Sequence, residues 1–262
     1  MKLLITTVES VETMNISKSG KILSVNGCDM YFEVHGAGSP VLLLHGFTGS
    51  GALLTQLFNQ LAKTHQLIIP DLRGHGRSTN PSNTFTHRQV ALDMFALLEH
   101  LNIDKVKAVG LSAGGNTLLH MAIQQPNKIQ TMALVSATPY FPEQARKIMQ
   151  QFTVESKTEN DWQSMREIHV HGDEQIRTIW QQANAFSGSY DDMNFTPPFL
   201  AKIKAKTLIV QGDRDPLYPI EISVEMFRNI PDSHLWVMPG GGHVPLDKHT
   251  TQVFIDYLIS FL

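Results

Sequence analysis

The sequence has little cysteine, little net charge and no long hydrophobic run, which disfavours disulfide-rich, nucleic-acid-binding and membrane-spanning proteins. It contains one cysteine, Cys28, among 262 residues, so no disulfide can form within the chain. This usage is typical of a reducing compartment, and we expect a cytoplasmic protein in which Cys28 is a buried apolar residue of an early strand. The net charge is only −3, which favours neither nucleic acid nor an anionic membrane surface as a partner.

Long hydrophobic runs are also missing. No stretch approaches the roughly 18 apolar residues that a membrane-spanning helix needs. The apolar run at the start of the chain stops at Thr6, which makes it too short for a signal peptide. We therefore expect no membrane partner, and we interpret residues 1–18 as an N-terminal leader of undetermined structure. The contents of 42% hydrophobic and 17% charged residues are ordinary for a globular protein.

From Lys21 onward, strand-like and helix-like segments alternate. Polar and apolar residues alternate around Asn26-Gly27, which predicts an antiparallel hairpin at a sheet edge. Continuous apolar runs predict strands that are buried on both faces, at 41–44, 66–70, 106–111, 131–136, 207–211 and 235–238. Helical spacing occurs at 53–62, 86–101, 113–125, 220–229 and 251–262. This alternation predicts an α/β fold, with a mostly parallel central sheet and helices on both faces.

The alternation stops between residues 137 and 198. This stretch holds helix-like pieces at 143–152, 161–170 and 173–186, and Pro197-Pro198 closes it. We interpret 137–198 as a helical cap or lid inserted into a core formed by 19–136 and 199–262. Most of its large apolar residues are expected to pack onto the core, while a few line an apolar acyl or aryl pocket; they are Phe141, Met149, Phe152, Trp162, Met165, Trp180 and Phe186.

A serine stands between one predicted strand and one predicted helix. Gly110-Leu111-Ser112-Ala113-Gly114 has the G-x-S-x-G pattern of a nucleophile elbow, a sharp turn that lifts a serine hydroxyl above the edge of the sheet. The turn is strained and crowded, so the residues beside the serine must be small. The pattern alone is common, but its position between a strand and a helix favours the elbow.

Two possible partners follow later strands. Asp215 comes after the strand at 207–211, and His243 follows the last strand. Because parallel strands end at the same edge of a sheet, Ser112, Asp215 and His243 are expected to converge there. A serine hydroxyl needs a histidine to take its proton, and the histidine needs a carboxylate to fix its tautomer. We assign Ser112 as nucleophile, His243 as general base and then acid, and Asp215 as the orienting carboxylate.

These motifs together resemble those of α/β-hydrolase fold enzymes, with a helical cap as in esterase-like members. The resemblance rests on five segments, at 44–47, 71–78, 110–115, 212–215 and 242–243, and it covers nearly the whole chain from Lys21. It implies that the backbone amides of Phe47 and Ala113 form an oxyanion hole. It implies no cofactor and no metal. The implied activity is a carboxylic ester hydrolase that acts on a small apolar ester.

Several residues in these motifs have alternative roles. Asp213 competes with Asp215 as the acid. His45 and His75 are expected to hydrogen-bond locally and to structure their loops, and Arg73 and Arg77 are expected to anchor a loop. His169 and His171 suggest a metal, but no third ligand is evident, so we place them on a solvated cap helix.

The same three residues also serve other reactions. The alternatives are a hydrolase of carbon–carbon bonds in dienoic ring-fission products, a lactonase, a menaquinone-pathway lyase and a haloperoxidase-like perhydrolase. Epoxide hydrolases and haloalkane dehalogenases carry Asp where Ser112 stands, which disfavours them. A slow-turnover ligand receptor is the alternative from another class. The sequence predicts neither the physiological substrate nor the oligomeric state.

Overall fold

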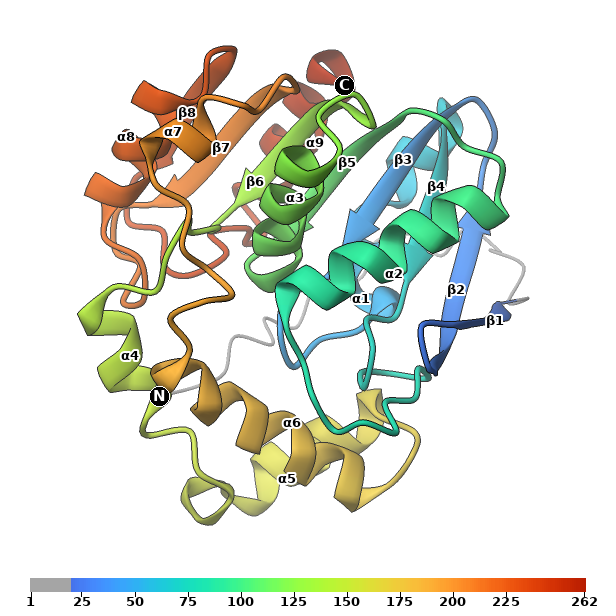
Figure 1. Ribbon diagram of the computed structural model, residues 1–262, viewed down its shortest axis with the longest axis vertical. Helices are drawn as coiled ribbons and strands as arrows, with labels where there is room; N and C mark the ends of the chain where they lie inside the picture. The colour runs from blue at the N-terminus through green and yellow to red at the C-terminus, as the bar shows by residue number, and fades with distance from the viewer. Residues whose placement is uncertain (1–19) are drawn as a thin grey trace.

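A computed structural model describes residues 20–262 of the chain (Figure 1). The predicted leader, residues 1–18, lies outside this range. Eight strands form one sheet in the order β1-β2-β4-β3-β5-β6-β7-β8. Strand β2 is antiparallel to β1 and β4, and every other neighbouring pair is parallel. The mostly parallel sheet is therefore confirmed, with these bounds: β1 (Lys21–Val25), β2 (Cys28–His35), β3 (Ser39–Leu44), β4 (His65–Pro70), β5 (Val106–Leu111), β6 (Ile129–Val135), β7 (Lys206–Gly212) and β8 (Ser233–Met238).

Helices cover both faces of this sheet (Figure 1). Along β3, Leu42 and Leu44 enter one hydrophobic cluster, while Val41 and Leu43 enter another on the opposite face. This explains the continuous apolar runs, because both faces of these strands are buried. The first cluster contains residues of α2 (His87–His100), α3 (Ala113–Gln124) and α8 (Ile220–Asn229), and the second contains residues of α1 (Gly51–Leu57), the 3₁₀ helix η1 (Asn59–Lys63) and α9 (Thr251–Phe261).

One predicted helix is broken. Residues 53–62 were expected to form a single helix, but α1 ends at Leu57 and the 3₁₀ turn η1 follows. Phe58 leaves the helical conformation, with φ −110° and ψ 16°, and its ring is fully buried near Phe254. Burial of this ring accounts for the break, since tertiary packing overrides local helical propensity.

Between β6 and β7, the described chain contains helices and one isolated bridge, Tyr140 to Asn194. In Figure 1, α4, α5 and α6 lie together beyond one end of the sheet. The Pro197-Pro198 pair begins a short helix, because proline suits the first helical position. The bounds are α4 (Glu143–Met149), η2 (Val154–Ser156), α5 (Glu159–Ile168), α6 (Asp173–Ala185), η3 (Phe186–Gly188) and α7 (Pro197–Leu200).

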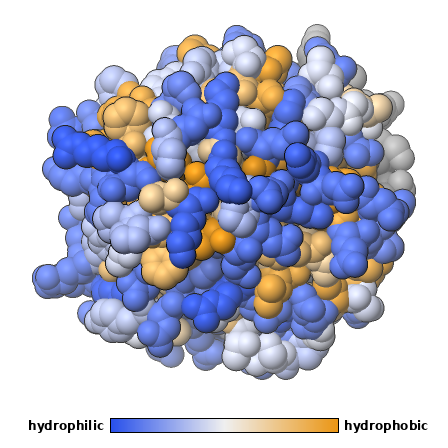
Figure 2. Space-filling model, turned by 45° about the horizontal axis from the view of Figure 1, so that its top comes forward, coloured by the Kyte–Doolittle hydropathy of each residue, from blue (hydrophilic) through white to orange (hydrophobic). Residues whose placement is uncertain are grey.

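The surface is mixed in character. On the face shown in Figure 2, hydrophobic residues are scattered in small groups among hydrophilic ones. Within residues 20–262, no helix is both long and apolar enough to cross a membrane. Cys28 is buried in β2, as the sequence predicted.

Candidate active site

Ser112 occupies a strained turn between β5 and α3. Its backbone has φ +50° and ψ −112°, an unusual conformation for a residue with a side chain. The neighbouring glycines allow the turn: a Cβ on Gly114 would collide with the backbone of Leu44, and one on Gly110 would collide with the backbone of Gly114 and Gly115. The amide of Ser112 is anchored to the carbonyl of Val135, 2.8 Å away. The predicted elbow geometry is thus present.

A chain of hydrogen bonds joins the three residues singled out in the sequence. His243 Nε2 lies 2.8 Å from Ser112 Oγ, and His243 Nδ1 lies 2.8 Å from Asp215 Oδ2. The carboxyl of Asp215 is fully buried, and the His243 side chain is 17% exposed. The competing Asp213 takes no part in this chain of hydrogen bonds. Its Oδ1 accepts from the backbone amide of Gly240, which is the role of a turn residue.

The carboxyl of Asp215 has a partner that the sequence did not suggest. Gln211 is completely buried near the end of β7, and its Nε2 donates to Asp215 Oδ2 at 2.8 Å. Ser223 Oγ in turn donates to Gln211 Oε1 at 3.2 Å. The other oxygen of Asp215 accepts from the amides of Leu217 and Tyr218. The one available signal was a polar residue within a buried apolar strand, which must find a partner there.

These contacts keep the Asp215 carboxyl ionised and determine which ring nitrogen of His243 faces it. Burial alone would raise the pKa of Asp215, but the hydrogen bond and charge of His243 and the two backbone amides outweigh it and lower that pKa. An ionised carboxylate only accepts hydrogen bonds, so His243 Nδ1 carries the proton and Nε2 is free to accept from Ser112. The ring of Tyr218 packs edge-on against His243, 5.3 Å between centroids.

Two backbone amides near Ser112 have no acceptor in the described part of the chain. One is the amide of Ala113, at the first position of α3, and the other is the amide of Phe47. The loop of Phe47 lies against the serine, because a Cβ on Gly46 would be 3.5 Å from Ser112 Cβ. The positive end of the α3 dipole also favours negative charge beside Ser112.

The side chain of Phe47 contacts the segment between β6 and β7. Its ring meets Phe186 at 4.8 Å and Phe85 at 4.9 Å, in both cases edge-to-face. Of the seven large apolar residues predicted to pack in this segment, five are buried: Phe141, Met149, Met165, Trp180 and Phe186. Phe47 also packs against the small cluster around Trp180. An aromatic surface therefore adjoins the loop next to Ser112.

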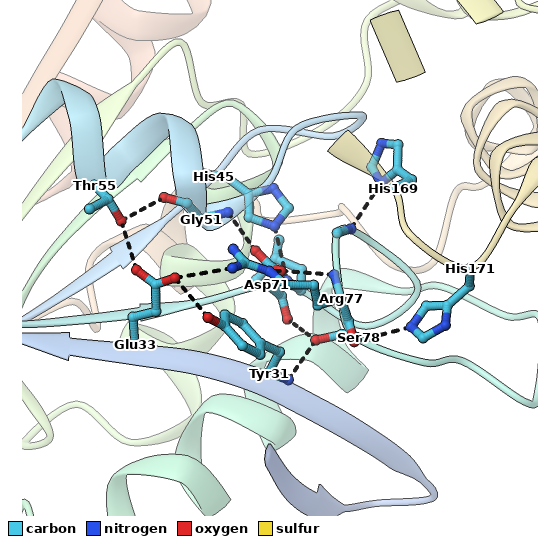
Figure 3. A network of polar contacts seen from close by, with 12 residues as sticks. Tyr31, Glu33, His45, Gly51, Thr55, Asp71, Arg77, Ser78, His169 and His171 are labelled. Atoms are coloured by element: carbon cyan, nitrogen blue, oxygen red, sulfur yellow. Dashed lines mark hydrogen bonds and ion pairs between the residues drawn. The ribbon is translucent and has the colours of Figure 1, made fainter. Parts of the chain in front are cut away.

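The loop after β4 is held by buried charges (Figure 3). Asp71 is fully buried, and its carboxylate accepts from the amide of Gly51 at 2.6 Å and from the backbone and side chain of Arg77 at 2.8 and 3.0 Å. Arg77 also reaches Glu33 at 3.1 Å. Arg73 forms a bidentate ion pair with Asp93 at 2.7 and 2.8 Å. Both arginines are loop anchors, as the sequence analysis expected.

The histidines of the motifs also behave locally as expected. His45 lies 2.8 Å from the carbonyl of Gly46 through Nδ1, and its Nε2 accepts from the amide of Leu72 at 2.9 Å. His75 Nδ1 lies 3.0 Å from the carbonyl of Arg73. Both rings are fully buried, and burial lowers the pKa of each. They are therefore neutral side chains that structure the loops around Ser112.

The prediction that His169 is solvated is wrong. Its side chain is 2% exposed, because the ring lies between the loops at 46–49 and 74–77. His169 Nδ1 accepts from the amide of Gly76 at 2.8 Å, and Nε2 lies 3.1 Å from the carbonyl of Thr48. His171 is exposed, as expected, and reaches the carbonyl of Arg77. Within residues 20–262, no group of three or more potential ligand side chains could hold a metal ion.

Comparison with known proteins agrees with this architecture. The α/β hydrolase fold family profile matches residues 39–153. The serine hydrolase BPHL of Mus musculus is 28% identical over 243 residues, covering 90% of this chain and 84% of that protein. The putative carbamate hydrolase RutD of Azorhizobium caulinodans is 24% identical, covering 89% of this chain and 94% of that protein.

A solved structure shows the same fold. An esterase from Exiguobacterium antarcticum superimposes with a TM-score of 0.77 at 23% identity, covering 93% of this chain and 99% of that one. These relatives support a hydrolase but leave its bond type and substrate open. The chain therefore has the α/β-hydrolase fold.

Proposed function

We propose that this protein is a serine hydrolase that cleaves carboxylic esters through an acyl-enzyme. Ser112 is the nucleophile, His243 the general base and acid, and Asp215 the carboxylate that orients His243. The observation that carries the proposal is the pair of 2.8 Å contacts that link Ser112, His243 and Asp215. This arrangement matches the requirements for activating a serine hydroxyl at neutral pH.

The first half of the reaction forms the acyl-enzyme. Ser112 Oγ attacks the ester carbonyl while its proton moves to His243 Nε2. Asp215 stabilises the imidazolium that results. When the tetrahedral intermediate collapses, the carbon–oxygen bond to the alcohol breaks, and His243 Nε2 gives the proton to that alcohol. Water then attacks the acyl-enzyme by the same route and releases the acid and free Ser112.

The amides of Phe47 and Ala113 bind the oxyanion in both halves. Both lie beside Ser112 and lack an acceptor among residues 20–262. A preorganised donor of this kind contributes about 2.7–4 kcal/mol to transition-state stabilisation in other hydrolases. The two amides are backbone groups, so the geometry of their turns matters more than the side chains that they carry.

We further propose that residues 137–198 cap a core made of 19–136 and 199–262. The rings of Phe47, Phe85 and Phe186 suit an uncharged acyl or aryl group next to the scissile ester. The single cysteine suits a reducing compartment such as the cytoplasm.

The proposal predicts Ser112-dependent turnover of simple esters. Steady-state hydrolysis of p-nitrophenyl esters, from acetate to long acyl chains, would be measured for the wild type and for Ser112→Ala. We expect Ser112→Ala to lose turnover by about 10⁶-fold in kcat while keeping its fold by circular dichroism. Ser260→Ala, at an exposed site on α9, is the control and is expected to match the wild type.

Two results would contradict the proposal. One is full activity of a folded Ser112→Ala variant, which would exclude the nucleophile. The other is negligible hydrolysis of every ester by folded wild type, which would favour carbon–carbon bond cleavage, lactone hydrolysis or a receptor role.

A further inference from the structure

The turn that carries the Phe47 amide is strained. The amide of Gly49 donates to the carbonyl of Gly46 at 3.1 Å, which closes a four-residue turn with Phe47 and Thr48 in its centre. Thr48 has φ +69° at the third position, where glycine or asparagine is normally required. A β-branched residue in that conformation persists only if its surroundings hold it there.

Each end of the turn is held by a buried histidine. At one end, His45 Nδ1 lies 2.8 Å from the carbonyl oxygen of Gly46, the first residue of the turn. At the other end, His169 Nε2 lies 3.1 Å from the carbonyl of Thr48. His45 is adjacent in sequence, but His169 is 121 positions from Thr48 and follows α5 in the proposed cap.

The second nitrogen of His169 determines which proton it carries. The amide of Gly76 can only donate, so Nδ1 of His169 must be unprotonated to accept from it at 2.8 Å. The remaining proton is then on Nε2, which donates to the Thr48 carbonyl. Burial lowers the pKa of His169 to about 4, so this neutral tautomer is the form present near pH 7.

The chain next to His169 is fastened to the same loop. The amide of Val170 donates to the carbonyl of Gly76 at 3.2 Å, and Gln175 Nε2 donates to the carbonyls of Gly74 and Gly76 at 3.1 Å. Figure 3 shows His169 and His171 both directed at this loop from the cap side. Of these residues, only His169 also forms a hydrogen bond to the turn of Phe47, through the carbonyl of Thr48.

We propose that His169 is a positioning residue for the oxyanion hole: it holds the turn of Phe47 through the Thr48 carbonyl and thereby couples the cap to the reaction. The inference rests on the proposed function, because it assigns the Phe47 amide to the oxyanion. His169 itself touches neither substrate nor reacting atoms. Its effect is to keep a strained turn in the orientation that the transition state needs.

Two conservative variants separate the two bonds of His169. In His169→Asn, the side-chain oxygen takes the place of Nδ1 and still accepts from Gly76, but nothing reaches Thr48. In His169→Gln, the longer amide takes the place of Nε2 and still donates to Thr48. His171→Asn is the matched control, because His171 bonds to the carbonyl of Arg77 on the same loop and not to the turn.

The kinetic test uses p-nitrophenyl acetate. We expect His169→Asn to lower kcat by about tenfold to a hundredfold with little change in KM, because the lost contact acts on the transition state. We expect His169→Gln to recover most of kcat and His171→Asn to retain all of it. A merely structural role would give His169→Asn and His169→Gln similar activity, since both preserve the fold through one of the two bonds.

Amide hydrogen exchange provides a readout that does not depend on turnover. We expect faster exchange of the peptide containing residues 46–49 in His169→Asn than in His169→Gln or His171→Asn. Equal exchange together with equal kcat in the two His169 variants would overturn the inference. If the wild type hydrolyses no ester, the proposed function fails, and the exchange comparison still decides whether His169 holds the turn.

Discussion

Two groups flank Ser112 and are held by different parts of the chain: His243 with Asp215 (the histidine side), and the turn that carries the Phe47 amide (the oxyanion side). On the histidine side, Asp215 is fixed by Gln211 from β7 and by the amides of its own turn. On the oxyanion side, the turn of Phe47 is fixed by His45 at one end and by His169 at the other. The first set belongs to the sheet and its adjoining turns, whereas the second reaches across to the segment between β6 and β7.

This difference separates the contacts made by the sheet from those made by the segment between β6 and β7, the proposed cap. The orientation of His243 depends on Asp215 and Gln211 at the end of β7, a buried strand that is hydrogen-bonded to a neighbour on each side. The turn of Phe47 depends on a bond from outside that core. We therefore propose that the sheet and its adjoining turns hold the proton-transfer residues, whereas the proposed oxyanion hole depends on the segment between β6 and β7.

The largest expected effect is on the histidine side. Asp215→Asn allows the wrong tautomer of His243, and we expect kcat to fall by about 10⁴-fold. Asp213→Asn is the matched control, since its side-chain oxygen can still accept from Gly240 and it makes no bond to His243. Steady-state kinetics with p-nitrophenyl acetate measures both. Equal losses in the two variants would remove the distinction between the two carboxylates.

The smallest expected effect is on the oxyanion side and appears in the pH dependence of stability. His169 has a pKa of about 4 in the folded protein, below its ordinary value of 6.5, and it faces His45, Asp71 and His75. Between these pH values the unfolded chain binds a proton at this site that the folded chain does not. The free energy of unfolding therefore falls as pH drops from 6.5 to 4, by up to about 1.4 kcal/mol per pH unit for one such group.

Urea unfolding of wild type and His169→Gln between pH 4.5 and 7 measures this contribution. The buried His45 and His75, whose pKa values burial lowers, act in the same direction in both proteins. The charge of His169 also lowers the pKa of His75, and its removal in His169→Gln makes the loss of stability shallower still. We expect a shallower loss of stability on acidification in His169→Gln. Identical pH dependence in the two proteins would show that His169 is not held neutral by the fold.

The sequence predicted the sheet and the positions of Ser112, Asp215 and His243 because those features are local. Buried strands appear as continuous apolar runs; Ser112 directly follows β5, and Asp215 and His243 lie in the turns that follow β7 and β8. Parallel strands then bring their ends to one edge without further information. The choice of Asp215 over Asp213 rested on the spacing in the family that the chain resembles, and the contact with His243 agrees with it.

His169 could not be predicted in the same way. Its neighbours Glu167, Val170 and His171 are exposed, so the surrounding pattern indicates a solvated helix end. The ring is buried because tertiary packing brings two loops over it, from residues far away in the chain. Phe58 likewise interrupts a helical pattern at the point where its ring is buried near Phe254 of α9. The spacing of apolar residues along the chain does not predict such long-range contacts.

Covalent labelling can decide whether Ser112 is the activated nucleophile that we propose. Folded wild type would be treated with a fluorophosphonate, and the modified residue would be identified by peptide mass spectrometry. We expect a single phosphonyl group on Ser112, with none bound to Ser112→Ala and much slower labelling of Asp215→Asn. Labelling at a different residue, or no labelling of the folded wild type, would contradict it.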